Sequence, residues 1–533
     1  MKNSRRRFMQ TSAGTLAVGS VGLARSFIAF GNSIAIEDAE AKRARRNAAH
    51  RIRRVIYNDD GCPFGEIFTP ESFLGARMTS VLHSHVDSVY FSTTVWDDRF
   101  SHVPKVGEFV ADSMLEGDAQ SMQNLCQTFK ILADAGTDAM QLTLDFCQKH
   151  KLEFMWSYRV NDIHDAFEIG RLAKFKRDNP HLLLGKPADF SKSGQSKWWT
   201  ALDFAAEPVR QRRLDIIADV LDRYDVDGID LDFCRTPIFF RSTMEGKPAT
   251  SAETAIMTDL VRKIRHLILA ASQRRGRPVL LSMRTPVSLE LCRYVGMDVE
   301  GWLKEGFLDV LVPGQGYVPL TMPAQGLVEL GHQYDVTVYP CICGSAKTFG
   351  TYGQKPEIWR AAASNLFSYG ADGVMVFNFF PNKPSEILET IGDPSLAADR
   401  MFGIDPRYSG SDVDHVVALE GTLPVPISSG KKTDLKPFPV GDDLATAQDS
   451  GKLKSIELLV RIDPLGDQKV SLWLNGNDLG DAERRGDWLA TSPPVTAVKR
   501  GLNRLSLVVG DVDNSAADLL SVTDVQLWVR YNK

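Results

Sequence analysis

Three aspartates lie within six residues of a segment that otherwise looks like a buried strand. They are Asp227, Asp230 and Asp232 in the stretch YDVDGIDLDF. An isolated buried carboxylate is very costly, so such a group lies in a wet cleft, pairs with a cation, or changes its pKa. Side chains alternate along a strand, so Asp230 and Asp232 share one face while Ile229 and Leu231 share the other. The spacing predicts two aspartates that project together, with Asp232 nearer the strand's end and Asp227 capping or pairing before the strand.

The stretch belongs to a series of eight β-rich runs that alternate with segments of helical spacing. Such alternation implies parallel strands joined by right-handed crossovers. Eight units predict a (β/α)8 TIM barrel over residues 50–395. A doubly wound open sheet is the alternative, but no Gly-rich phosphate loop follows the first run. The runs cover residues 54–59, 87–94, 152–158, 226–233, 279–285, 308–314, 336–342 and 372–379.

Beyond residue 405 the pattern changes from helical spacing to short alternating runs separated by turn residues. This predicts a C-terminal β-sandwich domain over residues 409–533. Trp473 and Trp528 lie within alternating runs, and Trp488 lies between two such runs. We expect these tryptophans in the core of the sandwich, with a ligand-binding face as the alternative.

Barrel active sites form where the strands end, and the residues after several runs are polar or aromatic. Canonical glycoside hydrolysis needs two carboxyl groups. Asp232 is the predicted first carboxylate, and the second is expected in the loops after the second and third runs. A histidine there could tune a carboxylate or act as a base itself. These further candidates are Asp97, Asp98, Asp162, Asp165 and His164.

Three arginines follow neighbouring runs, at Arg159, Arg235 and Arg284. Converging guanidinium groups favour carboxylate or sulfate, because the planar fork donates two hydrogen bonds. An acidic or sulfated sugar would suit them, although some must neutralise Asp230 and Asp232. Flat aromatic rings and polar groups complete the predicted substrate-binding set. These residues are Trp96, Asp97, Trp156, Tyr158, Asn161, Gln315 and Tyr317.

The stretch VDGIDLDF resembles the fourth strand of barrel glycoside hydrolases, in which an acidic residue at the strand's end performs catalysis. Over residues 50–395 the chain is most similar to bacterial glycosyl-hydrolase-like barrel proteins. It also resembles the family 18 chitinase signature through Asp227, Gly228, Asp230 and Asp232. Cys234 stands where that signature has its catalytic glutamate, so the chitinase mechanism is not implied. The fifth and seventh runs do not end in glutamate either.

The resemblance implies a glycoside hydrolase acting on a polysaccharide or oligosaccharide. A non-catalytic carbohydrate-binding barrel is a second possibility, favoured by the missing glutamates. A third is a metal-dependent hydrolase using Asp97, Asp162, His164 and Asp232, although these four residues form no His-x-His or Glu-x-x-His motif that would favour a metal. We expect no cofactor and a carbohydrate as the partner.

The N-terminal segment predicts export. The stretch SRRRFMQ at residues 4–10 precedes a short Gly/Ala-rich apolar run, and residues 1–41 resemble a twin-arginine signal and linker. The run is too short to span a membrane stably, so we expect a periplasmic or secreted protein after cleavage. A net charge of −5 gives no case for nucleic acid. Seven scattered cysteines suggest reduced core residues rather than a disulfide framework.

Overall fold

The computed structural model describes residues 37–186, 196–314, 320–343, 355–406, 421–510 and 520–532. The predicted export signal lies almost wholly outside these residues. None of the helices within the described ranges is long and apolar enough to cross a membrane.

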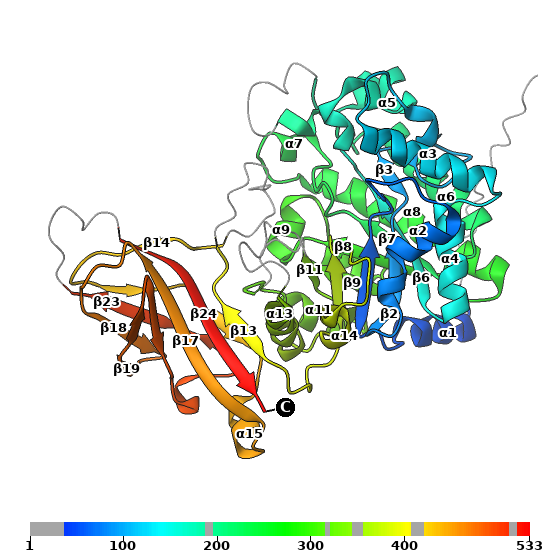
Figure 1. The fold of residues 1–533 in the computed structure, drawn as a ribbon. Helices are drawn as coiled ribbons and strands as arrows, with labels where there is room; N and C mark the ends of the chain where they lie inside the picture. The colour runs from blue at the N-terminus through cyan, green and yellow to red at the C-terminus, as the bar shows by residue number, and fades with distance from the viewer. Residues whose placement is uncertain are drawn as a thin grey trace, which may run out of the picture. The chain divides into compact units, whose positions relative to one another are not determined.

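The parallel sheet confirms the predicted (β/α)8 TIM barrel (Figure 1). Each of the eight predicted runs forms a strand, and the seventh is split at Tyr339 and Pro340. Its first part pairs with β9 and its second with β12, so this one segment joins the two ends of the sheet. The strands are β1 (Val55–Asp59), β2 (Val86–Phe91), β6 (Glu153–Arg159), β7 (Gly228–Asp232), β8 (Leu280–Thr285), β9 (Val310–Pro313), β10 (Thr337–Val338), β11 (Cys341–Cys343) and β12 (Val374–Phe377).

Helices follow the strands and cover the outside of the barrel (Figure 1). The longest, α8 (Ser251–Arg275), begins at a capping box between Thr250 and Glu253 and ends at Gly276, whose φ of 63° suits a glycine. Its buried residues recur at helical spacing. The other main barrel helices are α2 (Pro70–Arg77), α3 (Gln120–Asp134), α4 (Ala139–His150), α5 (Lys174–Asp178), α6 (Glu207–Arg223), α9 (Leu289–Tyr294), α10 (Val299–Lys304), α11 (Gln325–Gln333), α13 (Pro356–Ser368) and α14 (Glu386–Thr390).

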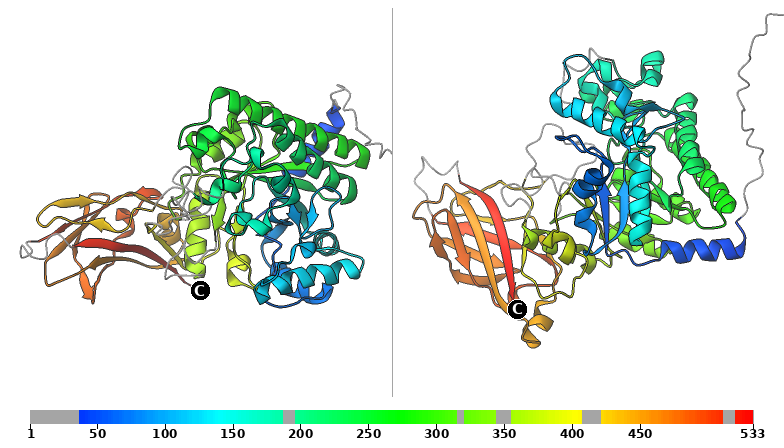
Figure 2. Two further views of the ribbon diagram at one scale, coloured as in Figure 1. Left: turned by 90° about the horizontal axis from the view of Figure 1, so that it is seen from above. Right: turned by 45° about the vertical axis from the view of Figure 1, so that its right-hand side comes forward.

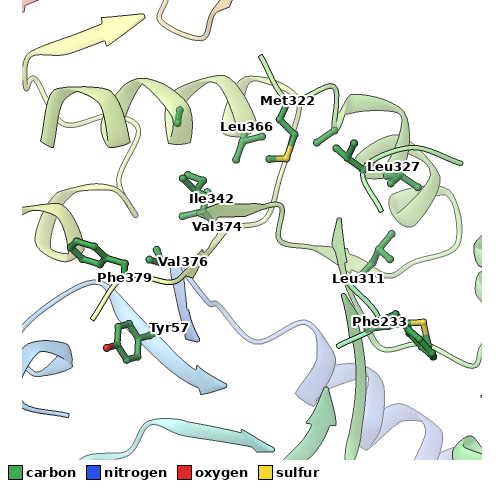
Figure 3. Close-up of a cluster of buried hydrophobic side chains, with 14 of the residues drawn as sticks. Tyr57, Phe233, Leu311, Met322, Leu327, Ile342, Leu366, Val374, Val376 and Phe379 are labelled. Atoms are coloured by element: carbon green, nitrogen blue, oxygen red, sulfur yellow. The ribbon is translucent and has the colours of Figure 1, made fainter. Parts of the chain in front are cut away.

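Alternation along the strands produces two apolar layers. Ile229, Leu231 and Phe233 belong to the large cluster between strands and helices, as their spacing predicts. Figure 3 shows this layer, with Ile342 of β11 near Leu366 of α13. A smaller cluster fills the barrel interior, and it contains Ile56, Tyr90, Met155, Leu280, Val310, Val312, Tyr339, Cys341, Cys343, Met375 and Phe377.

Helix α1 (Ala39–Ala49) closes the end of the barrel from which the strands start (Figure 2). Buried Arg53 donates to both Glu153 oxygens at 2.6 Å and to the Ala49 carbonyl at 2.7 Å. At the same end, Asp227 accepts from Phe154 N at 2.9 Å and pairs with Arg277 at 3.1 Å. Asp227 therefore pairs before the strand, as predicted, and the polar chemistry of β7 lies at its other end.

Antiparallel sheets form the C-terminal region, as the alternating runs predict. One sheet has the order β13-β24-β17-β21-β20, with β14 also on β24, and the other has the order β15-β23-β18-β19. The first sheet begins before residue 409, because β13 pairs with β24. The strands are β13 (Arg400–Gly403), β14 (Val425–Pro426), β15 (Lys432–Asp434), β16 (Phe438–Val440), β17 (Leu453–Asp463), β18 (Val470–Leu474), β19 (Asn477–Asp481), β20 (Glu483–Arg485), β21 (Trp488–Thr491), β22 (Gly501–Asn503), β23 (Leu505–Val509) and β24 (Ser521–Tyr531).

The tryptophans of this region are not in its core, which corrects the sequence prediction. Leu472 and Leu474 of β18 are buried, whereas Trp473 between them is only half-buried on the opposite face. Trp528 has the same relation to Leu527 and Val529 on β24, and Trp488 is also half-buried. Leucine and valine fill the space between the sheets, so the tryptophans that alternate with them lie on the opposite face of their strands. All seven cysteines of the chain are free and buried, as expected.

Candidate functional site

Asp232 lies at the carboxyl end of β7 and inside the barrel, where the spacing placed it. Its register partners are Arg159 on β6 and Arg284 on β8. Arg284 donates to both carboxylate oxygens at 2.9 Å, and the Arg235 backbone N–H donates to Oδ1 at 2.9 Å. Asp232 is only 3% exposed. The structure therefore holds this carboxylate in an ion pair across two neighbouring strands.

Asp230 lies one layer deeper and forms no ion pair with a cation among the described residues. Ser157 donates to Oδ2 at 2.8 Å and Ser282 donates to Oδ1 at 2.9 Å, from the two adjacent strands. Burial, followed by repulsion from Asp232, raises the pKa of Asp230 to about 7. The two aspartates of the motif thus differ in environment, because Asp232 has an arginine partner and Asp230 accepts hydrogen bonds from two serine hydroxyls.

The loop after β6 joins three of the predicted residues. His164 Nδ1 lies 2.9 Å from both Asp162 oxygens, and the Arg235 guanidinium donates to His164 Nε2. Because an arginine can only donate, Nε2 accepts and the proton of this neutral ring lies on Nδ1, facing Asp162. Lost hydration and the Arg235 cation lower the pKa of His164 below its ordinary value, against the opposing effect of Asp162. The His164 side chain is 35% exposed, so it can meet a ligand.

Asp162 is the buried member of this group. Burial acts to raise its pKa, but the interactions with His164, Arg159 and Arg235 outweigh burial and hold the pKa well below its usual range. Asp162 therefore remains a carboxylate that orients His164, and Nε2 can exchange a proton with a ligand once Arg235 releases it.

Arg159 lies at the centre of the carboxylates at the barrel mouth. Its Nη1 donates to the Thr94 carbonyl at 3.0 Å and lies 3.6 Å from Asp162. Electrostatic attraction to Asp162, Asp60 and Asp232 also raises the pKa of Arg159, against burial. Asp60 is the partly exposed carboxylate of this set, and Arg77 donates to it at 2.9 Å. We did not predict Asp60 as a site residue, although its position directly after the first strand was a usable signal.

A second ionic group lies under the loops after β2 and β6. Asp97 pairs with Arg213 at 2.9 Å and with Lys176 at 3.3 Å, and Lys176 also pairs with Asp165 at 2.8 Å. Arg213 further binds Asp98 at 2.7 Å. These side chains are fully or almost fully buried. Asp97, Asp98 and Asp165 are therefore joined to one another by cations from helices, rather than to Asp232.

Burial has different consequences within this second group. It raises the pKa of Asp165 to about 6 and raises that of Asp97, despite the nearby cations. For Asp98, Arg213 and Arg212 outweigh burial and lower the pKa. Arg213 and Lys176 were not predicted, because they come from α6 and α5 and no local spacing relates them to the aspartates.

Several predicted binding residues offer no free surface to a ligand. Trp156 and Tyr158 are stacked at 4.9 Å on the helix-facing side of β6 and are fully buried. Trp96 is buried beneath Arg171, 4.9 Å from its ring. Asn161 donates to the Ile238 carbonyl at 2.7 Å and accepts from Leu202 N at 3.1 Å, so its amide ties two loops together.

Two predicted residues, Gln315 and Tyr317, lie outside the described residues. Within the described ranges, no group of three or more His, Cys, Asp or Glu side chains is placed to hold a metal ion. Of the residues predicted for a metal site, Asp97 lies in the second ionic group, whereas Asp162, His164 and Asp232 lie at the barrel mouth.

Neither a known protein-family profile nor a curated protein sequence matches the chain. Among solved structures, it is similar to α-L-fucosidase isoenzyme 2 from Paenibacillus thiaminolyticus, with 14% identity over 64% of this chain and 48% of that chain and a TM-score of 0.38. The glycoside hydrolase domain of PgaB from Bordetella bronchiseptica has 12% identity over 64% and 99% of the two chains and a TM-score of 0.41. The α-amylase from Geobacillus thermoleovorans has 10% identity over 86% and 99% and a TM-score of 0.40. These neighbours are glycoside hydrolases, and the chain spans about half the length of the fucosidase.

Proposed function

We propose that the chain is an exported glycoside hydrolase that cleaves the glycosidic bonds of an acidic or sulfated polysaccharide or oligosaccharide. The observation that carries the proposal is the polar group at the barrel mouth. There, Asp162 and Asp232 lie around Arg159, and the partly exposed His164 is hydrogen-bonded to Asp162. Barrel active sites form at this end of the strands.

The proposed roles follow from the partners of each group. Asp232 supplies negative charge to the oxocarbenium-like transition state, since a carboxylate stabilises developing positive charge. His164, oriented by Asp162, transfers the proton. Asp165 is not assigned a role in catalysis, because Lys176 pairs with it in the second ionic group. Arg159, Arg235 and Arg284 supply the cationic surroundings that an acidic sugar would need.

The test is release of reducing ends from a panel of neutral, uronate-containing and sulfated polysaccharides. We expect release from at least one acidic polymer, and we expect it to fall at least about 100-fold in His164→Gln. Glutamine can still donate a hydrogen bond to buried Asp162, so the melting temperature of this variant should fall far less than its activity. The proposal fails if the purified protein releases no reducing ends from any member of a broad panel.

A specific observation favours a second candidate function, a non-catalytic carbohydrate-binding barrel. Both oxygens of Asp232 already accept hydrogen bonds from Arg284, so substrate must compete with an ion pair for this carboxylate. Saturable binding of a polysaccharide without release of reducing ends would identify this function. Metal analysis of the purified protein tests the metal-dependent alternative in the same experiment.

A further inference from the structure

Arg235 differs from the other arginines at the barrel mouth, because within the part of the chain that the structure describes no carboxylate lies within 4.0 Å of its guanidinium to form an ion pair. Arg284 pairs with Asp232, and Arg159 lies against Asp162. The Arg235 side chain instead donates to a neutral acceptor, His164 Nε2. Its Nε is buried and has no hydrogen-bond partner among the described residues. A buried donor without a partner is costly, so this guanidinium has unused binding capacity.

Two of the segments outside the described residues have no carboxylate in their sequences to supply the missing negative charge. The segments after β9 and β11 that lie outside the described residues, 315–319 and 344–354, contain no Asp or Glu in their sequences. The charge that they do contain is the cation Lys347. A negative charge for Arg235 is therefore expected from a ligand rather than from these loops.

We propose that Arg235 is the receptor for an anionic group of the substrate, a carboxylate or a sulfate ester, and that its occupation enables His164 to take up a proton. The inference rests on the proposed function and names the substrate feature that the same site recognises. A planar guanidinium suits both anions, because its donors lie in one plane and can bind two oxygens at once. One Arg235 donor now lies on His164 Nε2, and it must turn to the bound anion before Nε2 can take up a proton, because a protonated imidazole accepts no hydrogen bond.

The effect on His164 follows from the charges around it. Arg235 and Arg159 lower the pKa of His164 and Asp162 raises it, while Lys176 donates to the Asp162 carbonyl at 3.0 Å. An anion on Arg235 would offset the repulsion between that guanidinium and a protonated imidazole. The pKa of His164 should therefore rise on binding. By linkage, a protonated His164 should also bind the anion more tightly.

The test is titration of the full-length protein with sodium acetate and with sodium sulfate, at an ionic strength held constant with sodium chloride. NMR of 13C-labelled histidine reports the His164 ring, assigned by its loss in His164→Gln. We expect a saturable shift with acetate, with sulfate or with both, and a higher pKa of His164 in the saturated protein. Comparing the two anions distinguishes a carboxylate receptor from a sulfate receptor.

Matched variants identify the receptor. Arg235→Gln should weaken anion binding roughly 10- to 100-fold, because it removes charge-assisted hydrogen bonds. Arg235→Lys keeps the charge and loses the planar fork, so its affinity should lie between those of the wild type and Arg235→Gln. Arg274→Gln on α8 is the control, since exposed Arg274 pairs with Asp222 and should leave binding unchanged.

Three results would overturn the inference. They are no saturable shift of His164, equal anion affinity in Arg235→Gln, or tighter anion binding in Asp189→Asn. The last result would show that Asp189, from the segment 187–195, is already the negative charge of Arg235. The binding experiment does not need turnover, so it is distinguishable from the proposed function. Anion binding without hydrolysis of any polymer would refute the hydrolase, and hydrolysis without anion binding would refute the receptor.

Discussion

Arg284 binds Asp232 through two parallel hydrogen bonds, from Nε to Oδ1 and from Nη2 to Oδ2, each 2.9 Å long. Both side chains are 3% exposed, and the guanidinium also lies 4.0 Å from the centre of the Phe377 ring. Removing one partner of a buried ion pair typically costs about 3–5 kcal/mol, because the other charge is left buried and unpaired. The residue that the sequence singles out for catalysis therefore also carries stability, and a single substitution cannot separate the two roles.

A pair of variants can separate them. Asp232→Asn should lower the free energy of unfolding by about 3–5 kcal/mol and lower turnover at least about 100-fold. Asp232→Asn combined with Arg284→Met removes both charges and should recover most of the stability, while turnover stays lost. The measurements are chemical denaturation and reducing-end release on both proteins. Recovery of turnover in the double variant would remove Asp232 from the catalytic group.

Asp230 predicts how stability depends on pH. Its carboxyl keeps a proton in the folded chain up to about pH 7, whereas the ordinary value is 3.8. Between these values the folded chain binds more protons than the unfolded chain, so the contribution of Asp230 to stability falls as pH rises. Between pH 3.8 and about pH 7 the free energy of unfolding falls by about 4 kcal/mol through Asp230, at 1.36 kcal/mol per pKa unit.

Asp230→Asn should remove this dependence. The amide has nearly the shape of the protonated carboxyl and can still bond Ser157 and Ser282, whose hydroxyls can both donate and accept. We expect the variant to be more stable than the wild type by about 4 kcal/mol at pH 8 and by only about 1.6 kcal/mol at pH 5, because most of the proton loss lies above pH 5. Denaturation curves at both pH values provide the comparison. A wild-type slope that persists in the variant would contradict the assignment to Asp230.

Much of the fold could be predicted because two periodicities alternate along the chain. The run VDGIDLDF shows why, since Ile229, Leu231 and Phe233 face the helices and the aspartates face inward. The same argument failed at Trp473, where tryptophan and leucine alternate and either could occupy the core. Leucine occupies it, because Leu472 and Leu474 fit between the sheets.

The candidate site was less predictable than the fold, because its electrostatics depend on partners distant in sequence. Asp97 and Asp165 looked similar to Asp162 in a polar loop. Lys176 and Arg213 assign Asp97 and Asp165 to a separate ionic group, and neither cation is related to them by a local motif. The helix-facing orientation of Trp156 could have been predicted from alternation along the strand. Its neighbour Ser157 faces inward and donates to Asp230, so Trp156 must face outward.

The predicted export signal can be tested without the structure. Replacing Arg5 and Arg6 by lysine should keep the protein in the cytoplasm, because the twin-arginine pathway reads that pair. Cell fractionation and immunoblotting measure the location of the wild type and the variant. Replacing Arg45 and Arg46 in α1 by lysine is a matched control and should leave export unchanged. Unchanged export of the Arg5/Arg6 variant would contradict the prediction.

The Asp162–His164 pair predicts the pH profile of turnover. The pKa of His164 lies below its ordinary value of 6.5, and Asp162 is the group that raises it. If His164 acts as the base, the acidic limb of kcat/KM, which reports the free enzyme, should lie below pH 6.5. Asp162→Asn should move that limb to lower pH and reduce the rate about 10²–10⁴-fold, because the ring loses its orienting carboxylate.

With an anionic substrate, the acidic limb of kcat should lie at higher pH than the acidic limb of kcat/KM, since the bound anion offsets the charge of Arg235. Rate measurements from pH 4 to 9 test these shifts, and a neutral substrate is the control that should show no gap between the two limbs. An acidic limb unmoved by Asp162→Asn would assign the proton transfer to another group.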